Sequence, residues 1–174
     1  AALGVAVAQK LCAVQAEIDL VVSPAAERTL SEECDDNALE ELKKTVSSSH
    51  DVRDVGARIA SGSAPVAGMI VAPCSMRSLA AIANGLDDNL LTQAAGVQLK
   101  ERKPLILLTR EAPLTLAHLR NMTAVTEMGG IILPPVPAFY LHPETLDDVV
   151  TQIAARAVDL LRIAAPVAGA WTPE

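Results

Sequence analysis

Aromatic side chains are almost missing from this chain of 174 residues, which has one Trp, one Tyr and one Phe. Yet 51% of its residues are hydrophobic. The core must therefore consist of Ala, Val, Leu and Ile, the residues that fill a parallel sheet covered by helices. A chain of this length suits a single domain that buries about two thirds of its unfolded surface.

Basic residues are also scarce, because 14 Lys and Arg are set against 21 Asp and Glu, for a formal net charge of -7. Nucleic-acid backbones bind cationic surfaces, so we expect no nucleic-acid partner. No apolar run reaches the roughly 18 residues of a membrane span, and the first residues show no signal-peptide pattern. We therefore expect a cytoplasmic protein with no membrane span.

Cysteine is limited to Cys12, Cys34 and Cys74, with no CxxC pair and no cluster with histidine. An odd and unpatterned set of this kind argues against a disulfide framework and against a structural zinc site. The three histidines show no spacing typical of a metal site either. We expect free thiols in a reducing compartment and no bound metal.

Apolar strand patterns alternate with helical patterns along the chain. Predicted strands cover 18–22, 68–72, 105–109 and 131–133, and predicted helices cover 1–15, 24–34, 75–84, 88–102, 116–128 and 145–163. Residues 35–63 are more polar and predict a short helix and a loop. The alternation predicts an α/β fold: a three-layer αβα sandwich, Rossmann-like or flavodoxin-like, with a mainly parallel sheet.

We expect one domain over residues 1–165 and a C-terminal tail over 166–174. The chain begins directly with a helical pattern, whereas an α/β domain normally opens with a strand. We therefore expect a first strand to precede Ala1.

Polar residues follow the predicted strands, where ligands of open α/β sheets bind. Ser23 and Ser75 each precede a helix whose free backbone N–H groups favour an anion. Arg110 adds a cation directly after a strand, and Phe139 and Tyr140 stand together in a proline-rich loop. These residues favour a site for a phosphorylated small molecule.

Each of these residues also has a purely structural interpretation. The two serines can be simple helix caps, and Lys100 can be a solvated cation at a helix end, where the dipole favours it. Arg110 can pair with Glu111 or with a neighbouring chain. Glu33 can belong to an exposed acidic face, and Arg156 can form a structural salt bridge.

Several motifs together resemble a known family. They are L-K-E-R-K-P-L-I-L-L-T-R-E-A-P-L (99–114), L-P-P-V-P-A-F-Y (133–140), the last helix with Arg156, A-S-G-S (60–63), A-P-C-S (72–75) and D-N-L-L (88–91). From Gly4 to about Ile163 the chain resembles the flavin prenyltransferases of the UbiX type, within the flavin-binding cysteine decarboxylase-like proteins.

The resemblance implies FMN bound between the subunits of a trimer, often assembled further into a dodecamer. It implies that a dimethylallyl group passes from dimethylallyl monophosphate to reduced FMN without a metal. The product, prenylated FMN, is the cofactor of a separate UbiD-type decarboxylase.

The resemblance also implies roles for individual residues. The phosphate-binding group corresponds to Lys100, Arg110, Tyr140 and Arg156, and Glu33 corresponds to the acid/base residue near the flavin. Ser23 and Ser75, together with Arg110, correspond to flavin-contacting positions. We expect the basic side chains and the tyrosine to converge in space, within one chain or through a neighbouring subunit, with Glu33, Lys100 and Arg110 taking part in catalysis.

Three departures from the family pattern stand out. The family's G-A-S-G turn would lie before Ala1, so we expect it upstream of this sequence. A family arginine is replaced by Gln93, and a tryptophan of some members falls near Val55. Two other functions stay open: an FMN-dependent cysteine-type decarboxylase, which does not need these cations, and a non-catalytic flavin binder.

Overall fold

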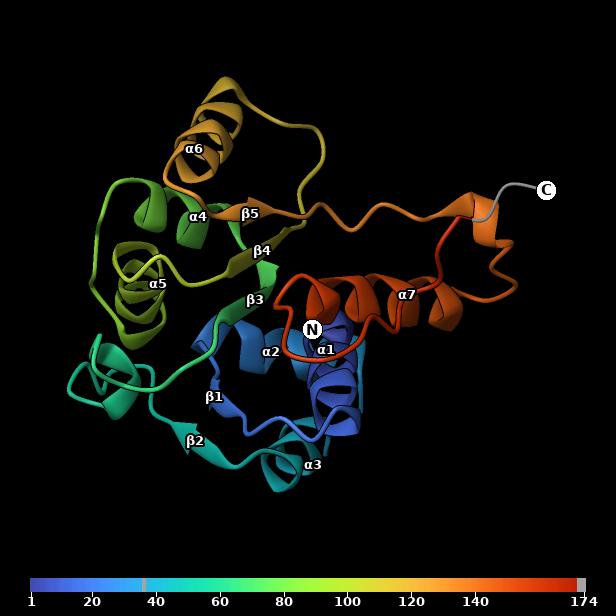
Figure 1. Ribbon diagram of the computed structural model, residues 1–174, viewed down its shortest axis with the longest axis horizontal. Coiled ribbons are helices and arrows are strands. Elements are labelled where there is room, and N and C mark those ends of the chain that lie inside the picture. The colour runs from blue at the N-terminus through green and yellow to red at the C-terminus, as the bar shows by residue number, and fades with distance from the viewer. Residues whose placement is uncertain (36, 172–174) are drawn as a thin grey trace.

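The computed structural model describes residues 1–35 and 37–171. Helices and strands alternate along most of this length (Figure 1). The helices are α1 (Ala2–Ala13), α2 (Pro24–Glu33), α3 (Ala38–Thr45), α4 (Met76–Ala83), α5 (Leu90–Lys100), α6 (Leu116–Glu127) and α7 (Leu146–Asp159). The strands are β1 (Asp19–Val21), β2 (Ser48–His50), β3 (Met69–Cys74), β4 (Leu105–Thr109) and β5 (Ile131–Ile132). Two short 3₁₀ helices, η1 (Arg58–Ala60) and η2 (Phe139–Leu141), lie in the connections.

Side-chain caps fix the start of five helices, which is why the predicted helix starts agree closely with the structure. Each cap accepts a hydrogen bond from a backbone N–H of the first helical turn, which would otherwise lack a partner. The capping residues are Ser23, Ser75, Asn89, Thr115 and Thr145.

All strand pairs in the described residues are parallel, as predicted. The strands form two hydrogen-bonded sets, β1-β2 and β3-β4-β5. The central strand β4 is buried along its whole length, as expected for a parallel strand covered on both faces. The prediction of an additional strand before Ala1 concerns residues outside this chain and stays a prediction.

Helices cover both faces of the β3-β4-β5 sheet and complete the predicted three layers (Figure 1). On one face, α1 and α7 pack against each other and bury Ile106 and Leu108 of β4. On the other face, α4, α5 and α6 bury Leu105 and Leu107 of the same strand. The alternation of side chains along one strand therefore supplies both cores.

Helix α1 lies so close to β3 that only glycine fits at one contact. A Cβ atom on Gly4 would stand 2.5 Å from the backbone oxygen of Ala72. The absence of a side chain at Gly4 therefore lets the beginning of α1 reach the sheet.

Two predicted boundaries were wrong, and one strand was missed. Strand β3 does not stop before Pro73 but continues to Cys74, because Pro73 falls where the pairing with β4 shifts register and no N–H is needed. Strand β2 was missed, since its Ser-Ser-His sequence has no apolar pattern. Helix α7 ends at Asp159, four residues before Ile163.

The tail after α7 folds back along that helix as far as it is described. The backbone N–H groups of Val167 and Ala168 donate to the Asp159 carboxylate at 2.8 and 3.1 Å. Gln152 and Gly169 exchange two hydrogen bonds of 3.0 Å each. Residues 172–174 of the predicted tail lie outside the described residues.

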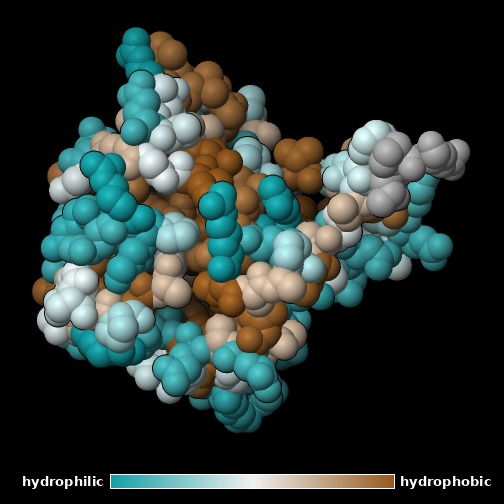
Figure 2. All heavy atoms as spheres, in the orientation of Figure 1, coloured by the Kyte–Doolittle hydropathy of each residue, from teal (hydrophilic) through white to brown (hydrophobic). Residues whose placement is uncertain are grey.

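Residues 134–146, which we call the arm, connect β5 to α7 and project from the rest of the fold (Figures 1 and 2). Its apolar side chains are exposed: Phe139 by 75% and Leu146 by 79%. Large apolar side chains exposed together are typical of surfaces that contact another protein.

Candidate functional site

The two serines predicted to begin helices do so. The Ser23 hydroxyl accepts from the Ala26 N–H at 3.2 Å, and the Ser75 hydroxyl accepts from the Ser78 N–H at 3.1 Å. Both follow the carboxyl end of a parallel strand, β1 or β3. Their structural role as caps is confirmed, and their role as flavin contacts stays a prediction.

Glu33 and Arg110 come together at the same edge, from the end of α2 and the residue after β4. The Glu33 carboxylate lies 3.9 Å from the Arg110 guanidinium and accepts the Ala2 N–H at 3.2 Å and the Ala1 amino group. Glu33 therefore contacts a basic side chain and a helix N–H, and it does not lie merely in an acidic run.

Tyr140 and Arg156 also come together, in a different place. They line one hollow of about 440 Å³ between the arm, α7 and the tail. Arg156 forms no ion pair with the residues the structure describes, so its structural interpretation as a salt-bridge partner finds no support there. A phenol and an unpaired guanidinium facing one space are suited to an anion.

Lys100 does not join either pair within one chain. It ends α5, shortly before β4 begins, whereas Arg110 follows the end of β4. The five residues of β4 span about 16 Å, at about 3.3 Å for each residue. The nearest carboxylate to the Lys100 amine belongs to Glu101, at 3.8 Å. The predicted convergence of all four phosphate-binding residues therefore does not occur within a single chain.

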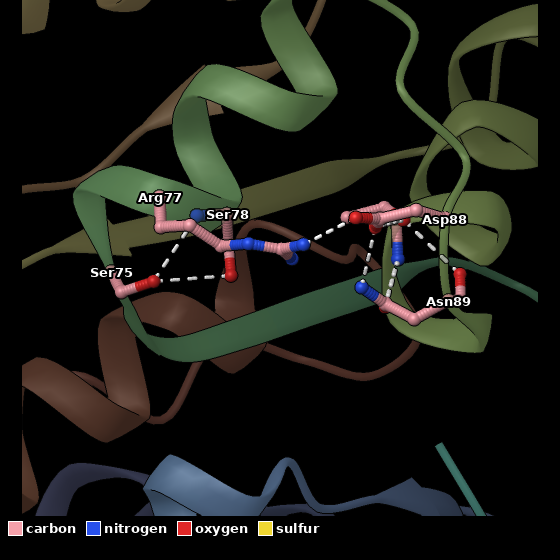
Figure 3. Close-up of polar contacts among 6 residues, drawn as sticks. Ser75, Arg77, Ser78, Asp88 and Asn89 are labelled. Carbon is pink, nitrogen blue, oxygen red and sulfur yellow. Dashed lines mark hydrogen bonds and ion pairs between the residues drawn. The ribbon is translucent and has the colours of Figure 1, made fainter. Parts of the chain in front are cut away.

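A network that the sequence did not reveal joins the beginnings of α4 and α5 (Figure 3). The Asp88 carboxylate accepts from the Arg77 guanidinium and, at 2.8 Å, from the Asn89 amide. Asn89 in turn caps α5. Arg77 lies two residues after Ser75, so this network fixes the helix turn that presents Ser75.

The buried hydroxyl of Thr109 was also missed by the sequence analysis. Thr109 is the last residue of β4, directly before Arg110, and it lies across from Cys74 on β3. Its oxygen is buried and has no hydrogen-bond partner in the described parts of the chain. A buried hydroxyl without a partner is uncommon and requires an explanation. A polar residue at the end of an otherwise apolar strand is the feature that would have identified it.

Comparison with known proteins agrees with this architecture. The Flavoprotein family model matches residues 3–158. The flavin prenyltransferase UbiX of Thauera aromatica is 47% identical over 169 residues, which cover 97% of this chain and 87% of that protein. The chain belongs to the UbiX-type flavin prenyltransferases.

Solved structures of this family support the assignment. The structure of AnUbiX (PadA1) in complex with FMN and dimethylallyl pyrophosphate superposes with a TM-score of 0.94 at 40% identity, over 99% of this chain and 91% of that chain. A dodecameric FMN-dependent UbiX-like decarboxylase from Escherichia coli O157:H7 gives 0.93 at 42% identity, over 98% and 92%. The predicted fold and family are confirmed.

The residues at the carboxyl edge fit the FMN that the family binds. The capped ends of α2 and α4 present backbone N–H groups, the Arg110 side chain is 58% exposed, and the Thr109 hydroxyl lacks a partner. A flavin, with its phosphate and its ring of hydrogen-bonding atoms, supplies acceptors and donors for such groups. Ser23, Ser75 and Arg110 are the residues that would hold it.

The remaining expectations concern membranes, metals and the departures from the family. Across residues 1–35 and 37–171, no helix has the length and apolar character needed to cross a bilayer, and no three Asp, Glu, His or Cys side chains gather as metal ligands do. Gln93 lies partly buried on α5, and Val55 is exposed between β2 and η1.

Proposed function

We propose that this chain transfers a dimethylallyl group from dimethylallyl monophosphate to reduced FMN. The bond between the allylic carbon and the phosphate oxygen breaks, a bond to the flavin forms, and inorganic phosphate leaves. Family membership at 47% identity and the AnUbiX complex with FMN and a prenyl donor support this function. The observation that carries it is the shared hollow of Tyr140 and Arg156.

The basic residues and Tyr140 serve the phosphate. Cations and phenol hydroxyls bind a phosphate most strongly as its charge increases during departure, which lowers the barrier to breaking the carbon–oxygen bond. In this proposal Arg156 and Tyr140 hold the leaving phosphate from one subunit, and Arg110 lies between the phosphate and the flavin.

Glu33 moves the proton. Its carboxylate lies beside the Arg110 guanidinium, where it can accept a proton at the flavin edge and pass it to the phosphate. Arg110, at 3.9 Å, keeps this carboxylate oriented.

Lys100 enters from a neighbouring subunit. Within one chain it lies beyond the opposite end of β4 from Arg110, so it completes the phosphate site only if subunits pack edge to edge. The dodecameric relative supports such an assembly, and the exposed arm provides a surface for it. We propose a trimer that assembles further into a dodecamer, with FMN between subunits.

Anaerobic incubation with reduced FMN and dimethylallyl monophosphate tests the reaction. We expect a flavin heavier by one dimethylallyl group, with a changed absorption spectrum, and release of inorganic phosphate. A cysteine-type decarboxylase would leave this flavin unchanged and release carbon dioxide from a cysteine-ending peptide. A flavin binder would retain FMN and do neither.

Mixed oligomers test the subunit arrangement. Lys100→Ala and Arg156→Ala should each abolish turnover. When both variants are coexpressed with different tags, about one quarter of the sites in randomly mixed rings receive an intact Lys100 and an intact Arg156 from different chains. Restored activity supports the shared site, whereas a site built within one chain gives no restoration.

The product would serve a separate enzyme. We propose that a UbiD-type decarboxylase receives the prenylated FMN and that both proteins work in the cytoplasm.

A further inference from the structure

A second hollow, of about 310 Å³, lies away from the proposed reaction site. It opens where α5 and α7 end and where β4 and β5 begin, and Lys103, Pro104 and Ile131 are among its lining residues. Ser23, Ser75 and Arg110 follow the opposite, carboxyl ends of the strands. Within one chain, a ligand in this hollow would therefore lie at the opposite end of the sheet from the flavin.

Three basic residues line this hollow: Arg102, Lys103 and Arg162. No acidic residue lines it, and none of the three forms an ion pair within residues 1–35 and 37–171. The Lys103 amine donates to the backbone oxygen of Ala64 at 3.0 Å, which leaves its charge unneutralised. In a chain of net charge -7, three such cations around one hollow make a local positive site.

The two arginines occupy backbone positions that favour glycine. Arg102 has φ of 57° and Arg162 has φ of 56°, both in the left-handed region. After α5, the N–H of Lys103 bonds to the Gln98 oxygen at 2.9 Å, the bond that commonly closes a helix ending in a left-handed residue, usually glycine. Cations are favoured near helix C-termini, but a basic residue in the last helical turn would supply that benefit without strain. Two strained arginines beside the same hollow point to a use for their side chains.

Part of the lining of the hollow is apolar, since Leu99, Met128 and Leu160 also line it. We propose that the hollow binds a small soluble organic phosphate with a short aliphatic chain. The guanidiniums would hold the phosphate by paired N–H bonds, and the aliphatic chain would cover the leucines and the methionine. A volume near 300 Å³ lies at the lower end of the range for small-molecule pockets.

Isothermal titration calorimetry of the FMN-loaded oligomer with hexyl phosphate tests the proposal. We expect hexyl phosphate to bind at least tenfold more tightly than inorganic phosphate or hexanol, because only hexyl phosphate uses both parts of the hollow. The double variant Arg102→Gly/Arg162→Gly should lose at least tenfold in hexyl phosphate affinity. Its melting temperature should be equal or higher, because glycine suits both backbone positions.

Arg110→Ala is the control for the location of the site. It should leave the tight hexyl phosphate binding intact, since Arg110 does not line the hollow and, within one chain, lies at the other end of β4. Hexyl phosphate binding that is lost in Arg110→Ala but kept in the double glycine variant would overturn the proposal. So would the absence of tight binding in the assembled protein, which would indicate that a neighbouring copy covers the hollow.

Discussion

The carboxylate of Glu33 and the guanidinium of Arg110 lie 3.9 Å apart, although one ends α2 and the other follows β4. Helix α2 follows β1, and Arg110 follows β4. Their contact therefore links the β1-β2 pair to the β3-β4-β5 sheet. The residue proposed to transfer a proton and a cation proposed to bind phosphate therefore meet at the edge where α/β folds bind their ligands.

Glu33→Gln should separate chemistry from binding. Glutamine keeps the size and can accept hydrogen bonds, but it cannot take up a proton at neutral pH. We expect the turnover number to fall by about 100-fold, the usual range for removal of an acid/base residue. FMN affinity, measured by fluorescence quenching, should change less than a few-fold. Equal loss of affinity and turnover would instead assign Glu33 to flavin binding.

Gly4→Ala should destabilise the protein strongly. The new Cβ would meet the Ala72 oxygen at 2.5 Å, and neither backbone can move without separating α1 from β3. We expect a loss of about 2 kcal/mol, within the range for overpacking a core contact, seen as a lower midpoint in urea. Gly56→Ala is the matched control, because its Cβ would meet only the Asp54 carboxylate at 3.5 Å.

Arg77→Ala tests whether the network at α4 and α5 positions the flavin site. Both partners of the Arg77–Asp88 pair are more than half exposed, so stability should fall by less than about 1 kcal/mol. FMN affinity should fall by about tenfold, which is about 1.4 kcal/mol, because the turn that carries Ser75 loosens. Arg28→Ala removes an exposed pair with Glu32 on α2 and serves as the control. Equal FMN affinity in both variants would show that the network is only structural.

Cys74 should resist alkylation in the folded protein. The side chain is fully buried, and burial raises the pKa of its thiol to about 12 from an ordinary value of 9.0. Iodoacetamide at pH 8 should therefore modify Cys12 and Cys34 first, as peptide mass spectrometry can show. Because the folded pKa is the higher one, Cys74 stabilises the fold below pH 9, and this contribution is lost as the pH rises toward 12. Between pH 9 and pH 12, the free energy of unfolding should therefore fall less in Cys74→Ala than in the unchanged protein.

Local chemistry explains which parts of the fold were predictable. Buried strands such as Leu105–Thr109 and capped helices such as the one after Thr145 have patterns that a few residues define. β2 was not predictable because its polar residues pair with β1 only through tertiary contact. The course of β3 through Pro73 depends on a register shift that no local pattern reveals.

The sequence predicted which residues belong to the candidate site better than it predicted how they are arranged in space. Resemblance of motifs suggested Glu33, Lys100, Arg110, Tyr140 and Arg156 together. The meeting of Glu33 with Arg110 joins elements of two separate sets of strands, which no local pattern reveals. The separation of Lys100 from Arg110 follows from their places at opposite ends of β4. The roles of these residues stay predictions until variants are measured.

In the proposed oligomer, neighbouring subunits would cover the exposed apolar side chains of the arm. A chain that holds Phe139 and Leu146 in water cannot shield them by refolding locally, because the arm has little core of its own. At low concentration, separate chains would bind other surfaces through these side chains. At high concentration, they would associate with one another first. A substitution that merely slows encounter between copies would then lower the yield of intact protein while leaving every catalytic side chain in place.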